Sequence, residues 1–340
     1  CWQPLAEPLL RFLPVGQPLR RLPRLWRLWW TIASEKNSEA RFGEGLGFVT
    51  DMPQTETVSA GAQSAKHEYD MRRLSYAGTF SNPFKAGTIR AIEWLTAKIT
   101  LLRLIRDFER SGAPFGSPFW PKAIRQMGIR IDTPPEEIAL IPATGPLVVV
   151  ANHPHGLVDG MIMAELVNRV RSDFKILTRS LLTGIPEVAE FMIPVPFPHE
   201  ENARQLGLEM RNETMAHLKA GGVIIVFPAG KVAMSEGFFG PAIEAEWNVF
   251  THKMIQRSGA TILPMHFTGQ NSRGFLIANK LSDTLRQGLL LYEIKRALFK
   301  PQRPYIGAPI PASELEKWDG NPRGFLAWLR QHTLDLGKKI

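Results

Sequence analysis

Two histidines and an aspartate lie close together, directly after a short apolar run. Residues 148–150 are valines, and residues 151–160 read Ala-Asn-His-Pro-His-Gly-Leu-Val-Asp-Gly. A carboxylate beside an imidazole fixes the ring tautomer and stabilises the charged ring, so the second ring nitrogen can take a proton from a nucleophile. Asp159 with His153 or His155 therefore supplies the parts of a general-base dyad. They could also bind a metal ion, but their spacing is a weak match, and we expect none.

The spacing leaves open which histidine pairs with Asp159. His153 and Asp159 are six residues apart, which on a continuous helix would place them on different faces. Pro154 and Gly156 favour a loop between them, so the geometry allows this pair. His155 and Asp159 are four residues apart and would share one face if a helix began early.

A second polar segment follows the apolar residues Val223–Phe227. Residues 228–235 read Pro-Ala-Gly-Lys-Val-Ala-Met-Ser. A strand that breaks at Pro-x-Gly offers backbone N–H groups, and Lys231 adds a positive charge, so this segment could bind an anion. The alternative is an ordinary turn with a solvated lysine.

Two more segments place polar residues after predicted strands. Lys175–Arg179 ends in a cation, and residues 263–272 include Pro264 and His266. His266 alone is more typical of a hydrogen-bonded core histidine. Because the carboxyl ends of parallel strands meet at one edge of a sheet, the four segments strengthen one another as a single site.

The elements that must position these side chains are short, β-branched strands that alternate with helices. Strands are predicted over residues 146–150, 174–177, 223–227, 261–265 and 303–306. Helices are predicted over residues 161–170, 202–219, 242–257, 284–299 and 322–336. This alternation is typical of an α/β fold, with a mostly parallel sheet flanked by helices on both faces.

An N-terminal amphipathic helix is predicted before these strands, over residues 87–110. Its apolar residues recur at spacings of three and four, and basic residues interrupt them. A bilayer-spanning helix needs roughly 20 mostly apolar residues, so we expect no transmembrane helix. The helix either packs its apolar face on the core or lies in a membrane surface with its arginines at the lipid phosphates.

Length and composition limit the class of protein. The chain has 340 residues, of which 44% are hydrophobic and 21% charged, so disorder throughout is excluded. Its single cysteine, Cys1, excludes an intrachain disulfide framework. Residues 1–70 are proline-rich at their start and carry no net charge, so we expect a flexible or non-native segment, with a basic, Trp-rich membrane-surface arm as the alternative. The formal charge of +9 belongs to the predicted domain, residues 71–340, and suits an anionic partner.

The order of the four polar segments resembles the motif blocks of the glycerolipid acyltransferase superfamily. The blocks read Asn-His-Pro-His-Gly…Asp-Gly, then Leu-Thr-Arg, then Phe-Pro-Ala-Gly, then Leu-Pro-Met…Gly. This is the PlsC-type, lysophosphatidic acid acyltransferase-like group. Within it the sequence is most similar to bacterial hemolysin-like lysophospholipid acyltransferases, which resemble the monoacylglycerol acyltransferase branch through a His-Pro-x-Gly block. The resemblance covers about residues 75–340.

The resemblance implies transfer of a fatty acyl group from acyl-CoA or acyl-carrier protein to a lysolipid hydroxyl, in phospholipid biosynthesis or remodelling. It assigns the general base to His153 and the orienting partner to Asp159, and it leaves His155 as an uncertain catalytic residue. It implies no cofactor beyond the acyl donor. The substrate-binding residues that it implies are Arg179, Phe227, Pro228, Gly230, Lys231 and Pro264.

The sequence departs from the family pattern in two blocks. The usual first block has four residues between His and Asp, whereas five follow His153 and three follow His155 before Asp159. The usual third block reads Phe-Pro-Glu-Gly-Thr-Arg, whereas Ala229 replaces the acid here and Lys231-Val232 replaces Thr-Arg. We therefore expect an acceptor head group other than the usual phosphate, such as an amino-acid lipid or a neutral lipid.

We expect the acceptor to attack the thioester directly, because no Ser or Cys stands in a nucleophile context. The expected partners are the acyl thioester, the lysolipid and an anionic membrane surface, to which the protein docks peripherally on the cytoplasmic face. No nucleic acid is expected, because the sequence lacks a nucleic-acid-binding motif. Two alternatives remain: an α/β hydrolase or thioesterase with water as acceptor, and a non-enzymatic lipid-binding protein.

Overall fold

The computed structural model describes residues 74–79, 82–178, 185–196, 202–318 and 320–338. The predicted N-terminal segment, residues 1–70, and the predicted site residue Arg179 lie outside the described residues. The predicted boundary between this segment and the folded domain therefore stays a prediction.

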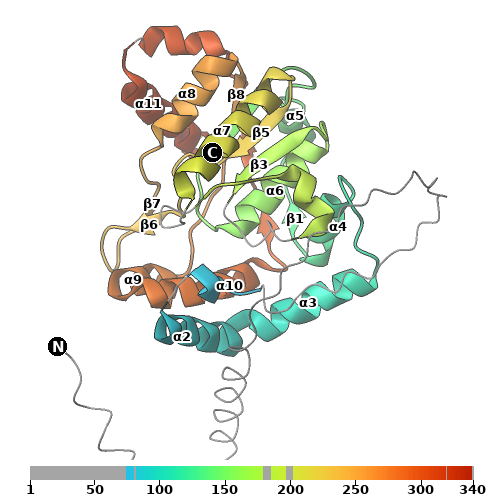
Figure 1. Ribbon diagram of the computed structural model, residues 1–340, viewed down its shortest axis with the longest axis vertical. Coiled ribbons are helices and arrows are strands. Elements are labelled where there is room, and N and C mark those ends of the chain that lie inside the picture. Colours follow the sequence, from blue (N-terminus) through green and yellow to red (C-terminus); the bar gives the residue numbers. More distant parts are fainter. Residues whose placement is uncertain (1–73, 80–81, 179–184, 197–201, 319, 339–340) are drawn as a thin grey trace, which may run out of the picture. The chain divides into compact units, whose positions relative to one another are not determined.

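A six-stranded sheet forms the centre of the described fold (Figure 1). Its strands run in the spatial order β10-β8-β2-β5-β3-β4, and every neighbouring pair is parallel except β10 with β8. The strands are β2 (Leu147–Ala151), β3 (Phe174–Thr178), β4 (Met192–Pro194), β5 (Val223–Val226), β8 (Thr261–His266) and β10 (Tyr305–Ile306). The predicted α/β fold with a mostly parallel sheet is thus confirmed.

Both faces of the sheet are covered, which explains why its strands are apolar without alternation. All five residues of β2 are buried. Leu147, Val149 and Ala151 pack into one core cluster, whereas Val148 and Val150 pack into another. Successive side chains of a strand point to opposite faces, so each face needs its own layer of helices.

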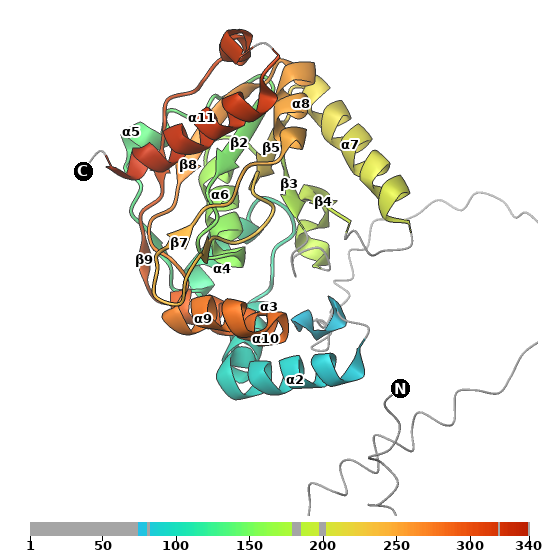
Figure 2. The ribbon, with the colours of Figure 1, turned by 90° about the vertical axis from the view of Figure 1, so that its left-hand side faces the viewer.

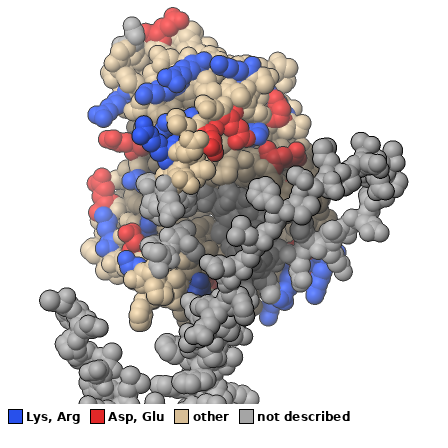
Figure 3. Space-filling view, viewed as in Figure 1, with Lys and Arg blue, Asp and Glu red and all other residues tan. Residues whose placement is uncertain are grey.

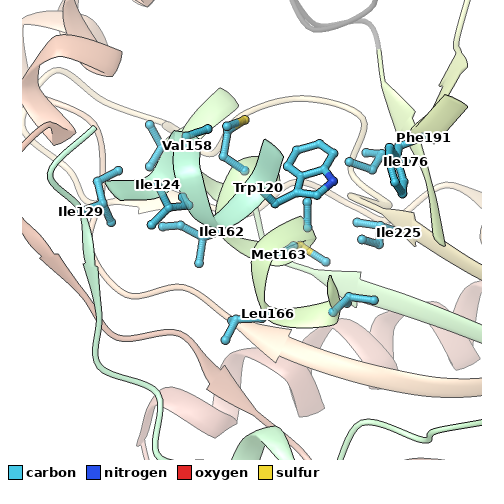
Figure 4. Packing of buried hydrophobic residues seen from close by; sticks show 14 of the residues in the cluster. Trp120, Ile124, Ile129, Val158, Ile162, Met163, Leu166, Ile176, Phe191 and Ile225 are labelled. Atoms are coloured by element: carbon cyan, nitrogen blue, oxygen red, sulfur yellow. The ribbon is translucent and has the colours of Figure 1, made fainter. Parts of the chain in front are cut away.

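The first face packs against α4 (Phe119–Gln126) and α6 (Leu157–Asn168). Trp120 on α4 is fully buried at the centre of this cluster, beside Ile162 and Met163 of α6 (Figure 4). Its ring meets Phe191 edge-on at 5.7 Å between centroids. This packing fixes α6, whose first turn carries Asp159.

The second face packs against α7 (Ala203–Lys219), α8 (Val249–Ser258) and α11 (Pro322–Asp335) (Figure 2). Leu218, Ile255 and Phe325 are fully buried there, one from each helix. Helices on both faces of a parallel sheet leave its carboxyl edge as the place where loops gather.

A layer of helices lies at one end of the described domain, beside that carboxyl edge (Figures 1 and 2). It consists of α2 (Pro83–Glu93), the π-helical segment η4 (Trp94–Lys98), α3 (Ile99–Arg110), α9 (Arg273–Leu281) and α10 (Asp283–Ala297). The predicted helix over 87–110 therefore begins earlier, at Pro83, where the Asn82 side chain accepts the N–H groups of Phe84 and Lys85. We call these five segments the helical layer.

A short hairpin, β6 (Met234–Ser235) and β7 (Ala242–Ile243), replaces the start of a predicted helix. The helix predicted over 242–257 begins only at Val249, because Ala242 and Ile243 pair with Ser235 and Met234. The Asn248 side chain caps the new helix start by accepting the N–H of Phe250.

The remaining elements are short. β1 pairs in parallel with β9, outside the main sheet. These elements are η3 (Tyr76–Thr79), β1 (Arg130–Ile131), α5 (Pro135–Ile138), η6 (Pro186–Phe191), β9 (Pro301–Gln302), η7 (Ala312–Trp318) and η8 (Leu336–Lys338). In the part of the chain that the structure describes, no helix combines the length and the apolar character that crossing a bilayer requires.

Candidate active site

The two histidines lie in the loop that joins β2 to α6. The loop needs a glycine at its last position, because Gly156 has φ of 83°, a conformation that side chains with a Cβ rarely adopt. Helix α6 then begins at Leu157, four residues earlier than predicted. This early start places Asp159 in the first turn of α6, next to the loop that carries the two histidines.

Asp159 brings both histidines together. The side chain is fully buried, and its Oδ2 lies 3.1 Å from Nδ1 of His153 while its Oδ1 lies 3.0 Å from Nδ1 of His155. Oδ2 also accepts the backbone N–H groups of His155, at 2.8 Å, and of Gly156, at 3.1 Å. The sequence left the choice between the two histidines open, and the structure places both against one carboxylate.

The electrostatics of this group set the ring tautomers. Burial alone would raise the pKa of Asp159, but the charge of His155 and the hydrogen bonds from both histidines lower it to about 2. An ionised carboxylate only accepts hydrogen bonds, so Nδ1 of each histidine carries the donated proton. Nε2 of each neutral ring is then left as the basic nitrogen.

The His153 ring and its peptide groups are held from several sides. The ring stacks on Phe227, with centroids 3.8 Å apart and an angle of 22° between planes. Its backbone carbonyl accepts the N–H of Ala233, at 2.8 Å, and its backbone N–H donates to Oε2 of Glu244, at 3.0 Å. Among the described residues, none is hydrogen-bonded to Nε2 of His153. His153 therefore combines a fixed ring with a side chain that is 17% exposed.

His155 is buried to a similar extent, and its Nε2 lies next to another loop of the protein. A Cβ added to Gly269 would lie 3.1 Å from Nε2 of His155, so that nitrogen lies against the loop that follows β8. Burial alone would lower the pKa of His155, but the charge and hydrogen bond of Asp159 outweigh it and raise the pKa. The two histidines thus differ in their surroundings: Nε2 of His155 borders Gly269, whereas the His153 ring stacks on Phe227.

Asn152 joins the first motif block to the fourth. The side-chain amide donates to the carbonyl of Phe267 and accepts its N–H, both at 2.8 Å. Phe267 follows directly after β8, so this pair ties the loop after β2 to the loop after β8. Asn152 is buried, and sequence reasoning did not single it out as a site residue.

The third block forms a tight turn beside His153. The N–H of Gly230 donates to the carbonyl of Phe227 at 2.9 Å, and Gly230 has φ of 64°. Pro228 is buried, whereas Lys231 is exposed. Phe227 is thus the predicted substrate-binding residue that the structure brings into contact with the dyad, and Lys231 lies on the surface of the same turn.

Pro264 does not lie in the loops at the carboxyl edge of the sheet. It is buried within β8, paired in register with Val150, and its carbonyl accepts the N–H of Gly307 at 2.9 Å. His266 ends the same strand, where burial lowers its pKa. Neither residue contacts the dyad in the described structure, so the fourth block reaches the site through Phe267 and Gly269 instead.

Sequence reasoning did not name Glu244 or Gly269 as site residues. Glu244 lies just after β7, inside a stretch predicted as helix, so no signal pointed to a site residue there. Gly269 was part of the fourth block, and its φ of 93° marks a position where a side chain would press on His155. Over the residues that the structure describes, no group of three or more His, Cys, Asp or Glu side chains could hold a metal ion.

Comparison with known proteins adds three findings. Residues 136–268 match the family model described as Acyltransferase. Over 188 residues, the chain is 26% identical to the lyso-glycine lipid O-acyltransferase of Phocaeicola vulgatus, and the match covers 52% of this chain and 63% of that protein. The chain thus spans less than two thirds of the length of this relative. The crystal structure of the 1-acyl-sn-glycerophosphate acyltransferase PlsC from Thermotoga maritima aligns with a TM-score of 0.42 and 15% identity, over 78% of this chain and 86% of that one.

Proposed function

We propose that the chain transfers a fatty acyl group from a thioester donor to a lysolipid hydroxyl, with His153 as the general base. The match of residues 136–268 to the Acyltransferase family model and the likeness to a lyso-glycine lipid O-acyltransferase support this proposal. The observation that carries the mechanism is the contact of Nδ1 of His153 with the buried Asp159 carboxylate, which leaves Nε2 as the basic nitrogen. The donor is acyl-CoA or acyl-carrier protein.

The proton and electron movements of this reaction balance at His153. Nε2 takes the proton from the acceptor hydroxyl as its oxygen attacks the thioester carbonyl carbon. The resulting oxyanion collapses, the C–S bond breaks, and the thiolate leaves with the proton that Nε2 returns. Asp159 stabilises the imidazolium in between, because its carboxylate stays ionised down to a pH of about 2.

The acceptor head group that we propose is an amino acid rather than a phosphate. The family's usual Glu and Thr-Arg in the third block are replaced by Ala229 and by Lys231-Val232. The curated relative is named for a lyso-glycine lipid, although the chain covers only 63% of it. Lys231 is an exposed cation beside the turn and could meet the carboxylate of such a head group.

We also propose that the helical layer rests on a membrane surface. Its exposed side includes large apolar residues, and the tip of the β6–β7 hairpin adds two more. These are Phe84, Trp94, Leu95, Ile99, Leu281 and Leu285 in the helical layer, and Phe238 and Phe239 in the hairpin. Such residues beside the carboxyl edge of the sheet would bring a lysolipid and an acyl chain to the dyad without leaving the bilayer.

The test is an acyl-transfer assay with the purified full chain. Acyl-CoA and acyl-carrier protein are offered separately with a panel of lysolipids that carry amino-acid, phosphate or uncharged head groups. We expect thiol release that depends on the lysolipid, with the acylated lipid formed in equal amount and the amino-acid acceptor used best. Thiol release at the same rate without any lysolipid would favour the thioesterase alternative and overturn the proposal.

A further inference from the structure

The β6–β7 hairpin holds the peptide groups of His153 on both sides. Ala233, directly before β6, donates its N–H to the His153 carbonyl at 2.8 Å. Glu244, directly after β7, accepts the His153 N–H through Oε2 at 3.0 Å. The hairpin therefore fixes the backbone of His153 independently of Asp159, which fixes its ring.

The Glu244 carboxylate is buried and hydrogen-bonded. Its residue is only 5% exposed, and its second oxygen, Oε1, accepts the indole N–H of the buried Trp247 at 3.1 Å. Each oxygen of the buried Glu244 carboxyl thus accepts one N–H, from His153 or from Trp247. Burial raises the pKa of Glu244, while the N–H groups of His153 and Trp247 oppose the rise.

We propose that Glu244 is a positioning residue for His153: it holds the backbone of the general base in place, while Asp159 holds its ring. The titratable groups that act on Glu244 are His153, on the loop after β2, and Asp159, on α6.

This inference rests on the proposed function for its catalytic consequence, but the placement of the His153 ring has a readout without substrate. NMR chemical shifts of the histidine rings at one fixed pH, with the His153 signal assigned by its loss in His153→Gln, report how that ring stacks on Phe227. The variants are Glu244→Gln and, as the matched control, Glu246→Gln. Glu246 lies two residues further along and is exposed.

We expect Glu244→Gln to shift the NMR signals of the His153 ring, because one of the two N–H donors, from His153 or from Trp247, then loses its acceptor. Glu246→Gln should leave these signals where they are in the wild type. Unchanged His153 signals in Glu244→Gln would overturn the inference, since the ring would then keep its place without the carboxylate. A wild type without acyl-transfer activity would overturn the proposed function and leave this comparison valid.

Activity tests the placement of His153 directly. Glu244→Gln should reduce kcat roughly 10- to 100-fold with KM nearly unchanged, because small displacements of a catalytic group cost rate rather than binding. Glu244→Asp keeps the charge but withdraws the oxygens by one methylene, so it should lose kcat as well. Wild-type kcat in Glu244→Asp would overturn the positioning role, even if Glu244→Gln failed to fold.

Discussion

The Asp159 carboxylate accepts four hydrogen bonds. They come from the ring N–H groups of both histidines and from the backbone N–H groups of His155 and of Gly156, the residue that precedes the first turn of α6. Negative charge at a helix N-terminus is favoured by the helix dipole, which adds to the effect of the hydrogen bonds. The residue that holds the two histidine rings therefore also fixes the start of the helix on which it lies.

The roles of the two histidines can be separated by replacing each one alone. We expect His153→Ala to reduce kcat by about 10²- to 10⁴-fold, the range that general-base catalysis contributes. His155→Ala should keep substantially more activity, because Nε2 of His155 lies against Gly269 rather than toward a substrate. Steady-state kinetics of both variants, with folding checked by circular dichroism, give the answer. An inactive His155→Ala beside an active His153→Ala would exchange the two roles.

The raised pKa of His155 predicts how stability depends on pH. A histidine whose pKa is higher in the folded protein stabilises it fully below its unfolded pKa of about 6.5, and this stabilisation is lost as the pH rises through the folded value. The free energy of unfolding of the wild type should therefore exceed that of His155→Gln most at pH 6, and the difference should shrink toward pH 9. Urea unfolding at several pH values measures this, and a difference that grows with pH would contradict it.

At the scale of elements, the hydrophobic pattern predicted the strands well. The predicted strand 146–150 is β2 at Leu147–Ala151, and the predicted strand 261–265 is β8 at Thr261–His266. Long apolar runs identify strands buried on both faces, because no polar face interrupts them. The contact between His153 and Asp159 did not follow from spacing, since it depends on the loop conformation at Gly156 and on the early start of α6.

Sequence reasoning missed helices α4 and α9 and several very short elements, among them the β6–β7 hairpin. The β6–β7 hairpin has two residues in each strand, too few for any periodicity. It is held by pairing with the loop after β2 and by Arg273, which donates to the carbonyls of Phe239 and Gly240. Glu244 was missed with it, because a buried carboxylate has no signature in sequence apart from the partners that bury it.

The link between the loops after β2 and β8 is itself testable. Asn152→Ala leaves the N–H and the carbonyl of the buried Phe267 without their partners. Each unsatisfied buried group costs about 1–3 kcal/mol, so the free energy of unfolding should fall by at least that amount. Denaturant unfolding measures the loss, and Asn248→Ala, which removes a helix cap on α8, gives a comparison outside the site. A fall no larger than about 0.5 kcal/mol would contradict the importance of this link.

At the scale of the whole described domain, charge and apolar surface coincide at the helical layer. Exposed basic residues line α2 and α3, and Figure 3 shows Lys and Arg side chains at the lower edge, where α3 lies in Figure 1. The exposed basic residues of α2 and α3 include Lys85, Arg90, Arg103, Arg106 and Arg110. Buried Ile89 and Leu101 show that the same helices pack on the protein, and the membrane-surface interpretation of their exposed faces stays a proposal.

Peripheral docking through this layer predicts a specific dependence on surface residues and salt. Phe84 is 87% exposed and Leu95 is 85% exposed, so replacing both by serine should barely affect folding but should weaken binding to vesicles. Burying an apolar side chain contributes about 1.5–3 kcal/mol, so the double variant Phe84→Ser/Leu95→Ser should bind at least tenfold less tightly. Co-sedimentation with vesicles that contain anionic lipid measures this.

The matched control is Leu208→Ser on α7, which packs on the far side of the sheet from α6 and whose side chain is also exposed. Binding by this control should equal that of the wild type. Binding by the wild type should also weaken steeply with salt, because surface charges are screened over roughly 8 Å at physiological ionic strength and each basic residue near an anionic bilayer contributes about 1 kcal/mol. Equal loss in the control and the double variant would assign vesicle binding to general hydrophobicity. Vesicle binding that does not depend on salt or on anionic lipid would contradict a role of the basic residues of α2 and α3. Docking would then rest on the exposed apolar side chains alone.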